Sequence, residues 1–329
     1  MRALVTGASG FIGGAVARAL LHRGAHVRVL LRSGAVPNLP ESREVEIVRG
    51  DLRDAPAVAA AVTGCDAVFH AGALYSFSAP QSEILAVNVG GTRNVIEAVR
   101  GEGARLVYTS SIAAVGAMHD GVLPDERCMP EGPAPGPYKR SKREAEELVR
   151  QAARKGLNAV IVNPTFPVGA GDVKPTPTGA VIRDFLAGRL PAYVDTGMNV
   201  IDVDDVAQGH VLAFERGQRG ERYILGHANL TMREFLEELA VVSGRKAPRF
   251  RMPHLVALGL AHADAFVTGR LLHRAPRIPL EGVRTAREIM FASSARAVRE
   301  LGLRQTPIRD ALAKAVQWFE MRSRERGVS

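Results

Sequence analysis

Cysteine is scarce in this chain: only Cys65 and Cys128 occur among 329 residues, and their spacing matches no pairing motif. The nine histidines contain no H-E-x-x-H pattern and form no cluster with the cysteines. These absences argue against a disulfide scaffold, and we predict no metal site. So few cysteines also indicate a reducing compartment, and we predict a cytoplasmic location.

Long apolar runs are absent too, since no stretch reaches the roughly 18 uncharged apolar residues of a membrane helix. The nearest is residues 253–274, where His254, His262, Asp264 and Arg270 break the run. Its pattern predicts a buried amphipathic helix. Glycines interrupt the apolar run near the amino terminus, so no signal peptide is predicted. We expect no integral membrane segment.

The chain also lacks a concentrated block of one charge, although its formal net charge is +9. Most basic residues alternate with glutamate on helix-like stretches such as residues 140–155, which argues against a nucleic-acid partner. A basic surface would instead attract phosphorylated small molecules. Hydrophobic residues make up 46% of the chain, enough for a sizeable core at this length.

What the chain does contain is a glycine-rich turn near its amino terminus. Gly7, Gly10 and Gly13 follow a short apolar strand-like run and precede a helix-like segment, and residues 26–31 resume a strand pattern. Such glycines permit a tight turn, a close approach of the backbone to a pyrophosphate, and close helix–strand packing. The free N–H groups of the helix start would face the phosphates. The pattern predicts a dinucleotide-binding site.

The kind of dinucleotide depends on the end of the second strand, which reads Leu30-Leu31-Arg32-Ser33. A carboxylate there would hold the ribose hydroxyls of NAD, but none is present. Arg32 can instead pair with a 2′-phosphate, in a charge-assisted hydrogen bond of roughly 1.5–3 kcal/mol. We therefore predict that NADP(H) is preferred. NAD(H) stays an alternative, because Arg32 could serve only to stack on the adenine.

Strand-like and helix-like segments alternate along the first half of the chain and predict an α/β fold, a doubly wound parallel sheet of the Rossmann type. The later strand-like runs are residues 43–52, 66–73, 105–111 and 158–164. We expect a dinucleotide-binding domain at residues 1–169, with a returning segment at about 200–226. A smaller, interwoven C-terminal α/β substrate domain would take residues 170–199 and 227–329.

Tyr138 and Lys142 stand four residues apart in a charged, helix-like stretch, so they share one helix face. Alone, the pair fits a solvated helix whose tyrosine packs on a lysine stem. Beside a dinucleotide site it suits hydride transfer: Tyr138 would be the acid or base, and the Lys142 ammonium and the positive charge of an oxidised nicotinamide would both lower its pKa. Lys142 could also hold the nicotinamide ribose. Ser111, at the end of a predicted strand, could donate a hydrogen bond to the substrate oxygen.

Seven motifs occur in a fixed order along the chain. They are TGASGFIG at 6–13, GDL at 50–52, HAGA at 70–73, VNVGGTRNV at 87–95, YTSSIAAVG at 108–116, YKRSK at 138–142 and NPTFPVG at 163–169. Together they resemble the extended short-chain dehydrogenase/reductase family, of the NAD-dependent epimerase/dehydratase type. The likeness is densest over the first 170 residues or so. The chain looks most like the branch with dihydroflavonol-4-reductase-like enzymes and hopanoid-associated sugar epimerases.

The resemblance implies that Ser111, Tyr138 and Lys142 form the catalytic set. It also implies most of the contacts to the cofactor. The cofactor-binding residues that we predict are Gly7, Gly10, Phe11, Ile12 and Gly13 in the glycine turn, Arg32, Asp51 and Leu52 beside the adenine, Ala71 and Ala73 along the diphosphate and ribose, Asn88 and Thr109 within the site, Tyr138 and Lys142, and Pro164 and Val168 by the nicotinamide.

Several reactions compete within this fold. Water loss is disfavoured because Ile112-Ala113-Ala114 follow Ser111, where the family's dehydratases carry an Asp-Glu pair. Nucleotide-sugar epimerisation is weakened because Met198-Asn199 stand where such epimerases often carry Arg-Asp, and Arg32 argues against a tightly held NAD. We predict NADP(H)-dependent reduction of a ketone or aldehyde, or the reverse oxidation. Epimerisation of a sugar-like hydroxyl is the alternative, and a non-catalytic nucleotide sensor is a remote one.

The substrate is less well defined. The predicted substrate-contacting residues are Ser111, Thr165, Phe166, Lys174 and Thr178. Together with an apolar helix at residues 255–266 they favour a small-molecule substrate with a hydrophobic body, such as an aryl or terpenoid ketone. A homodimer is also a possible assembly, with the segments at 96–103 and 141–155 as its candidate interface.

Four further polar residues receive structural interpretations. His70 ends a buried strand and is expected to be a hydrogen-bonded core histidine. Asp202, Asp204 and Asp205 could suggest a metal, but an apolar helical pattern follows them. We therefore interpret the three acids as capping and domain-joining residues.

Overall fold

The computed structural model describes residues 1–33, 39, 42–76, 79–118, 121–130, 132, 134, 136–264, 266–268 and 280–327. Seven strands within these residues form one parallel sheet in the order β10-β6-β5-β4-β1-β2-β3. They are β1 (Arg2–Thr6), β2 (His26–Leu31), β3 (Val45–Arg49), β4 (Ala67–His70), β5 (Arg105–Thr109), β6 (Ala159–Pro164) and β10 (Arg222–Leu225). The predicted doubly wound Rossmann-type sheet is confirmed.

The strand order reverses between β1 and β4. The chain builds β2 and β3 on one side of β1, then returns to add β4, β5, β6 and β10 on the other. Thr6 lies opposite His70 in the register, so the loops after β1 and β4 leave the same edge of the sheet. Folds of this kind bind ligands in the crevice at such a reversal.

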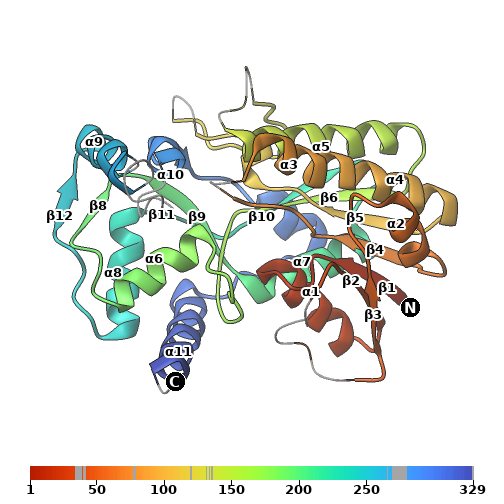
Figure 1. The fold of residues 1–329 in the computed structure, drawn as a ribbon, viewed down its shortest axis with the longest axis horizontal. Helices are drawn as coiled ribbons and strands as arrows, with labels where there is room; N and C mark the ends of the chain where they lie inside the picture. Colours follow the sequence, from red (N-terminus) through yellow and green to blue (C-terminus); the bar gives the residue numbers. More distant parts are fainter. Residues whose placement is uncertain are drawn as a thin grey trace.

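Helices cover both faces of the sheet (Figure 1). On one face α1 (Phe11–His22) packs against α7 (Val203–Arg216), and the other face carries α2 (Ala55–Val62), α4 (Gly91–Glu102) and α5 (Pro137–Arg154). The short helix α3 (Gln81–Leu85) and the π-helical turn η1 (Ala86–Gly90) precede α4, and the 3-10 turn η2 (Ile112–Ala114) follows β5. All six residues of β6 are buried, as expected of a strand covered on both faces.

The later part of the chain forms smaller sheets, which lie to the left in Figure 1. The strands β7 (Phe166–Val168), β11 (Ala228–Thr231) and β13 (Ile289–Met290) all pair with β9 (Gly197–Asp202), and β8 (Ala192–Val194) pairs with β12 (Phe250–Met252). The helices are α6 (Pro177–Leu186), α8 (Met232–Ser243), α9 (His254–Asp264), α10 (Leu280–Thr285), the π-helical turn η4 (Ala297–Leu301) and α11 (Ile308–Gly327). Side chains of α6, α8 and α11 form a further core on β9. The proposed domain boundaries stay a prediction.

The three acids at the start of α7 cap and join elements, as predicted. The Asp202 carboxylate accepts a hydrogen bond from the Asp204 backbone N–H at 2.8 Å and caps the helix. Lys314 of α11 pairs with Asp202 and Asp204. Asp205 accepts bonds from the backbone and hydroxyl of Thr306. Among the described residues, no group of acids, histidines and cysteines could hold a metal ion.

The prediction of a buried helix over residues 253–274 is wrong for the part that the structure describes. Helix α9 ends at Asp264 and buries mainly Ala257 and Ala261, while Leu255 is 79% exposed. The cause is that only one narrow stripe of small residues meets a neighbouring element. Residues 269–274 lie outside the described part. No described helix is both long and apolar enough to span a bilayer.

The glycine turn shows why two of its positions exclude a side chain. Gly7 adopts a φ of 74°, and a Cβ there would lie 2.6 Å from the backbone nitrogen of Gly72 in the loop after β4. A Cβ on Gly13 would lie 2.3 Å from the Gly7 carbonyl oxygen. The backbone of α1 therefore rests directly on the turn, and the turn rests on the neighbouring loop.

The first prediction concerns this contact. Replacing Gly13 with alanine should lower the free energy of unfolding by about 1–3 kcal/mol, because rigid backbone must move to admit the methyl group. Gly101→Ala in α4 is the matched control, since no heavy atom lies within 4 Å of its Cβ position. That change should instead stabilise by about 0.5–1 kcal/mol. Urea denaturation measures both, and shifts of the same sign would contradict the packing.

Candidate active site

The predicted catalytic residues meet at the carboxyl edge of the large sheet. Ser111 follows β5, and its hydroxyl accepts a hydrogen bond from the Ala113 backbone N–H at 3.2 Å. Helix α5 begins directly after Gly136, whose φ of 77° is left-handed, with Pro137 in its first turn. This start places Tyr138 beside Ser111, and a hydrogen bond joins the two side chains.

Tyr138 is partly buried and keeps its proton strongly. Burial raises the pKa of Tyr138 to about 12, and the hydrogen bond with Ser111 acts in the opposite direction. The ring of Tyr75 stands edge-on to Tyr138, with the ring centroids 4.5 Å apart. In the protein alone desolvation is the largest effect on this pKa. The side chain is therefore a neutral phenol in the protein alone. The lowering of the pKa by Lys142 and an oxidised nicotinamide together concerns the cofactor-bound site and stays a prediction.

Lys142 lies one turn further along α5 and is 4% exposed. Its ammonium donates a hydrogen bond to the Thr109 carbonyl oxygen at 2.9 Å, and it lies 5.5 Å from the centroid of the Tyr108 ring. Burial lowers the pKa of Lys142 to about 8, and the Glu146 carboxylate acts against that lowering. The site thus holds an ammonium that is close to losing its proton at neutral pH.

The start of α1 fits the diphosphate of a dinucleotide. Gly10 caps the helix without a side-chain hydrogen bond, and the first turn contains no acidic residue. The N–H groups and the positive end of the helix dipole are therefore available to an anion. Phe11 and Ile12 are partly buried there and pack on the core formed with α1 and α7. A side chain at Gly7 would collide with the backbone of the loop after β4, and one at Gly13 with the backbone of the turn itself.

The predicted adenine-side residues lie at the ends of β2 and β3. Arg32 is exposed and forms no ion pair within the described residues, while its charge reaches Asp51. Hydrogen bonds from Arg53 lower the pKa of Asp51 to about 2. Leu52 packs under the glycine backbone of the loop after β4, since a Cβ on Gly72 would lie 2.8 Å from its side chain. Within the described residues, Arg32 is thus an exposed cation without an ion pair at this end.

Ala71 and Ala73 belong to the loop after β4, whose course depends on Asn88. The Asn88 side chain bonds to the backbone N–H and carbonyl of Leu74 at 2.7 and 3.1 Å. It also donates to the Ser141 hydroxyl of α5 at 2.9 Å. Asn88 lies in a π-helical turn, a distortion frequent at functional sites. The loop and the catalytic helix are therefore tied to one side chain.

The remaining predicted cofactor contacts are more interior. The Thr109 hydroxyl is bonded to the His210 ring at 2.9 Å, so only its carbonyl serves Lys142. Pro164 ends β6, and Val168 is buried in β7. Pro164 thus lies at the carboxyl end of the strand next to β5, whereas Val168 belongs to the smaller sheet around β9.

The predicted substrate residues are not all brought together. Phe166 packs against the apolar group of Ile112 and Val115, directly after Ser111. The Thr165 hydroxyl already donates to the Leu225 carbonyl at 3.2 Å, which weakens its use as an anchor.

Two further predicted substrate residues belong to the approach to α6. Lys174 is exposed and Thr178 is buried in the first turn of that helix. These positions do not place either residue in the group around Ser111.

Sequence reasoning missed four polar residues behind the site: Ser110, Glu146, Asn163 and Arg222. Each is at most 4% exposed. Glu146 stands in a run of exposed charges in the sequence and gives no sign of burial there. Its i, i+4 spacing from Lys142 was the one available signal.

His70 is a core histidine, as predicted. The hydroxyl of Thr92 donates to the Asn88 carbonyl at 2.6 Å, so it accepts the proton of His70 Nε2 at 3.1 Å. Nδ1 of His70 then accepts from the Thr6 hydroxyl at 2.7 Å. Burial lowers the pKa of His70 to about 3, with a smaller contribution from Lys142. These hydrogen bonds link Thr6 of β1, His70 of β4 and Thr92 of α4.

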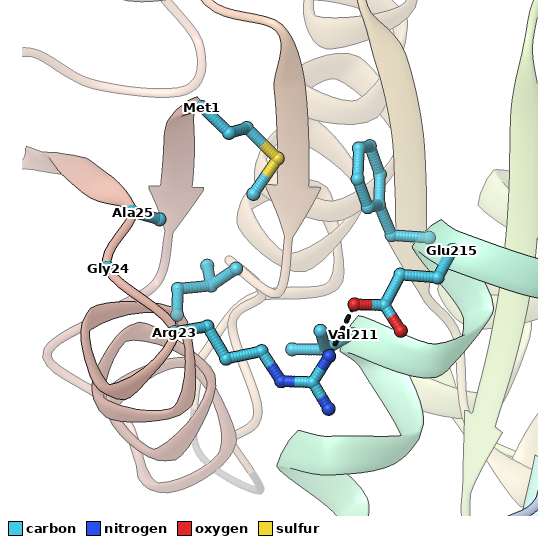
Figure 2. Close-up of a pocket in the computed structure, with 8 residues that line it drawn as sticks. Met1, Arg23, Gly24, Ala25, Val211 and Glu215 are labelled. Atoms are coloured by element: carbon cyan, nitrogen blue, oxygen red, sulfur yellow. Dashed lines mark hydrogen bonds and ion pairs between the residues drawn. The ribbon is translucent and has the colours of Figure 1, made fainter.

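A hollow elsewhere on the protein is not this site. It lies between α1 and α7, beside Met1 and Ala25 at the amino ends of β1 and β2 (Figure 2). An ion pair between Arg23 and Glu215 crosses it. The hollow faces away from the carboxyl edge that carries Ser111.

Comparison with known proteins agrees with this geometry. A family model described as the NAD-dependent epimerase/dehydratase family matches residues 3–226. A Synechocystis protein provisionally named dihydroflavonol 4-reductase is 42% identical over 96% of this chain and 94% of its own length. Sterol demethylase protein B of Methylococcus capsulatus is 34% identical over the whole of both chains. A solved nucleoside-diphosphate-sugar epimerase of Pseudomonas aeruginosa superposes with a TM-score of 0.79 at 28% identity, over 98% of each chain.

The second prediction uses the burial of His70. Between its ordinary pKa of 6.5 and about 3, the unfolded chain binds a proton that the native state does not. The free energy of unfolding should therefore fall as pH drops below about 6.5. In a His70→Gln variant that fall should be shallower by up to about 1.4 kcal/mol per pH unit.

Denaturation at several pH values measures this slope. His22→Gln is the matched control, because His22 is exposed at the end of α1 and is in water in both states. Equal slopes in the His70→Gln variant and the wild type would contradict the assignment of a neutral, buried ring.

Proposed function

The chain belongs to the NAD-dependent epimerase/dehydratase family, an oxidoreductase-type family that binds a nicotinamide dinucleotide, and from this premise we propose an NADP(H)-dependent carbonyl reductase. Its substrate would be a ketone or aldehyde with a largely apolar body, and the reverse alcohol oxidation would use the same groups. The observation that carries the proposal is the neutral Tyr138 phenol, hydrogen-bonded to Ser111 beside the buried Lys142 ammonium.

In a reduction, each catalytic residue would have a separate role. The bound nicotinamide would supply the hydride. The Ser111 hydroxyl would donate a hydrogen bond to the carbonyl oxygen as negative charge develops there. Tyr138 would deliver its proton to that oxygen, and the Lys142 ammonium would favour the tyrosinate left behind. Lys142 would also hold the nicotinamide ribose.

The choice of NADP(H) rests on Arg32. It is exposed at the end of β2, in the place where an NAD enzyme would carry an acid. The acid that follows the next strand, Asp51, is already paired with Arg53, so its charge opposes a phosphate less. These features support a 2′-phosphate site, with NAD(H) as the weaker ligand.

The apolar character of the substrate is supported by what lies behind Ser111. Ile112, Val115, Phe166 and Met290 form an apolar cluster there, with Cys128 at its margin. The names of the Synechocystis and Methylococcus relatives refer to an aryl compound and to sterols, which are largely apolar too. An aryl or terpenoid ketone stays the proposed class.

Epimerisation is the second candidate, and the similarity to the Pseudomonas epimerase favours it. It would use the same proton donor but would leave the amount of cofactor unchanged. The cytoplasmic location and a homodimer through the α4 and α5 regions also remain predictions.

The third prediction tests the catalytic set. Tyr138→Phe should lower kcat roughly 10²- to 10⁴-fold because the proton donor is lost. NADPH affinity should change far less than kcat, since the proton of the phenol is directed at the substrate oxygen. Tyr193→Phe is the control, because Tyr193 packs against the core around β9. The assay follows NADPH absorbance with a dihydroflavonol and a steroid ketone. Wild-type turnover in Tyr138→Phe would contradict the mechanism.

The fourth prediction tests the cofactor. Wild-type protein should bind NADPH at least about tenfold more tightly than NADH, and Arg32→Ala should lose roughly ten- to hundredfold in NADPH affinity alone. Arg100→Ala, at an exposed pair with Glu97 on α4, is the control. Fluorescence titration gives the dissociation constants. Equal binding of both dinucleotides, or NAD retained through purification, would put epimerisation first.

A further inference from the structure

A buried ion pair joins the catalytic helix α5 to the strand β10. Arg222 of β10 donates to Glu146 of α5 at 2.8 Å, and the two side chains are 5% and 4% exposed. The other oxygen of Glu146 accepts from Ser110 at 2.5 Å and from Asn163 at 2.7 Å. The carboxylate thus holds three separate elements of the sheet in addition to its own helix.

Glu146 is connected to two catalytic residues, Ser111 and Lys142. The Asn163 side chain also donates to the Ser111 carbonyl oxygen at 3.0 Å, so it joins Glu146 to the backbone of the catalytic serine. Glu146 is also one helical turn from Lys142, on the same face of α5. Its negative charge opposes the loss of the Lys142 proton.

The surroundings of Lys142 contain few other charges. The titratable groups that face it from packed elements are His70 of β4, Tyr108 of β5 and, on its own helix, Tyr138. His70 and Tyr108 are buried in their neutral forms at ordinary pH, since burial lowers the pKa of the first and raises that of the second. Arg222 is paired with Glu146. Among the described residues, Glu146 is therefore the anion whose charge acts on Lys142.

Stability alone is a weak reason for this arrangement. A buried ion pair often contributes no more than an apolar pair of similar size, because both charges must be stripped of water. Arg222 also donates to the carbonyl oxygens of Glu126 and Cys128, which fastens the loop that follows the site. Burying the pair therefore carries a desolvation cost, and the pair lies next to the site.

We propose that Glu146, held by Arg222, is a positioning residue that keeps Lys142 as an ammonium and fixes the backbone of Ser111. The idea rests on the proposed function only in taking Lys142 as a ligand of the nicotinamide ribose. Without the carboxylate, Lys142 loses its proton at a lower pH and binds the cofactor less well at and above neutrality.

The test is the pH dependence of the NADPH dissociation constant, measured by fluorescence titration between about pH 6.5 and 9.5. Wild-type affinity should weaken above about pH 8, as Lys142 loses its proton. In Glu146→Gln the weakening should begin about one pH unit lower or more. Glu146→Asp, which restores the charge, should move it back toward the wild type.

Glu147→Gln is the matched control. It removes the neighbouring carboxylate of the same helix, whose side chain is 41% exposed and pairs with Arg154. Its pH profile should match that of the wild type. A purely structural role for Glu146 would lower the melting temperature of Glu146→Gln and leave the profile in place, which would overturn the proposal. A wild-type profile that is flat over this range would overturn it too.

Glu146→Gln leaves Arg222 buried without its partner and could prevent folding. In that event the double variant Glu146→Gln/Arg222→Gln, which removes both charges, is titrated in its place. It should show the same shift, and an unshifted profile would count against the proposal. Repeating the series with NADH should give the same shift. A failed preference for NADPH is thereby distinguished from a failed role for Glu146.

Discussion

The site depends on a positive charge held inside the protein. The Lys142 ammonium is almost completely buried and has one carbonyl oxygen as its hydrogen-bond partner. Such a charge costs several kcal/mol of desolvation unless other groups offset it. The parallel sheet supplies the carbonyl at the end of β5, and α5 supplies the carboxylate of Glu146 one turn away. The position of the lysine thus constrains strand, helix and the residues between them.

The surrounding fold keeps these groups in register. The glycine turn after β1 rests on the loop after β4, and Asn88 ties that same loop to α5. A displacement of the dinucleotide cradle would therefore reach the catalytic helix through this backbone contact and the Asn88 side chain. Arg222 fastens the opposite side, where β10 meets the loop at residues 126–128. The proposed reductase activity therefore depends on these contacts as well as on Ser111 and Tyr138.

Local spacing made much of this predictable. The glycine turn, the strand and helix alternation and the Tyr138–Lys142 pair are all read within short windows, and the sheet followed from them. Glu146 was missed because its burial is decided by Arg222, 76 residues later in the chain. The raised pKa of Tyr138 in the protein alone was missed for the same reason: desolvation depends on neighbours that spacing does not reveal. The exposure of α9 likewise depends on which elements pack against it.

Net hydride transfer to a carbonyl carbon is the central claim, and isotope transfer tests it most directly. The protein is incubated with NADPH deuterated at the transferred position of C4 and with a dihydroflavonol or steroid ketone. Mass spectrometry then follows the product. The account predicts an alcohol that carries the deuterium, formed in equal amount to NADP⁺. An isomerised substrate with no net oxidation of NADPH would contradict it.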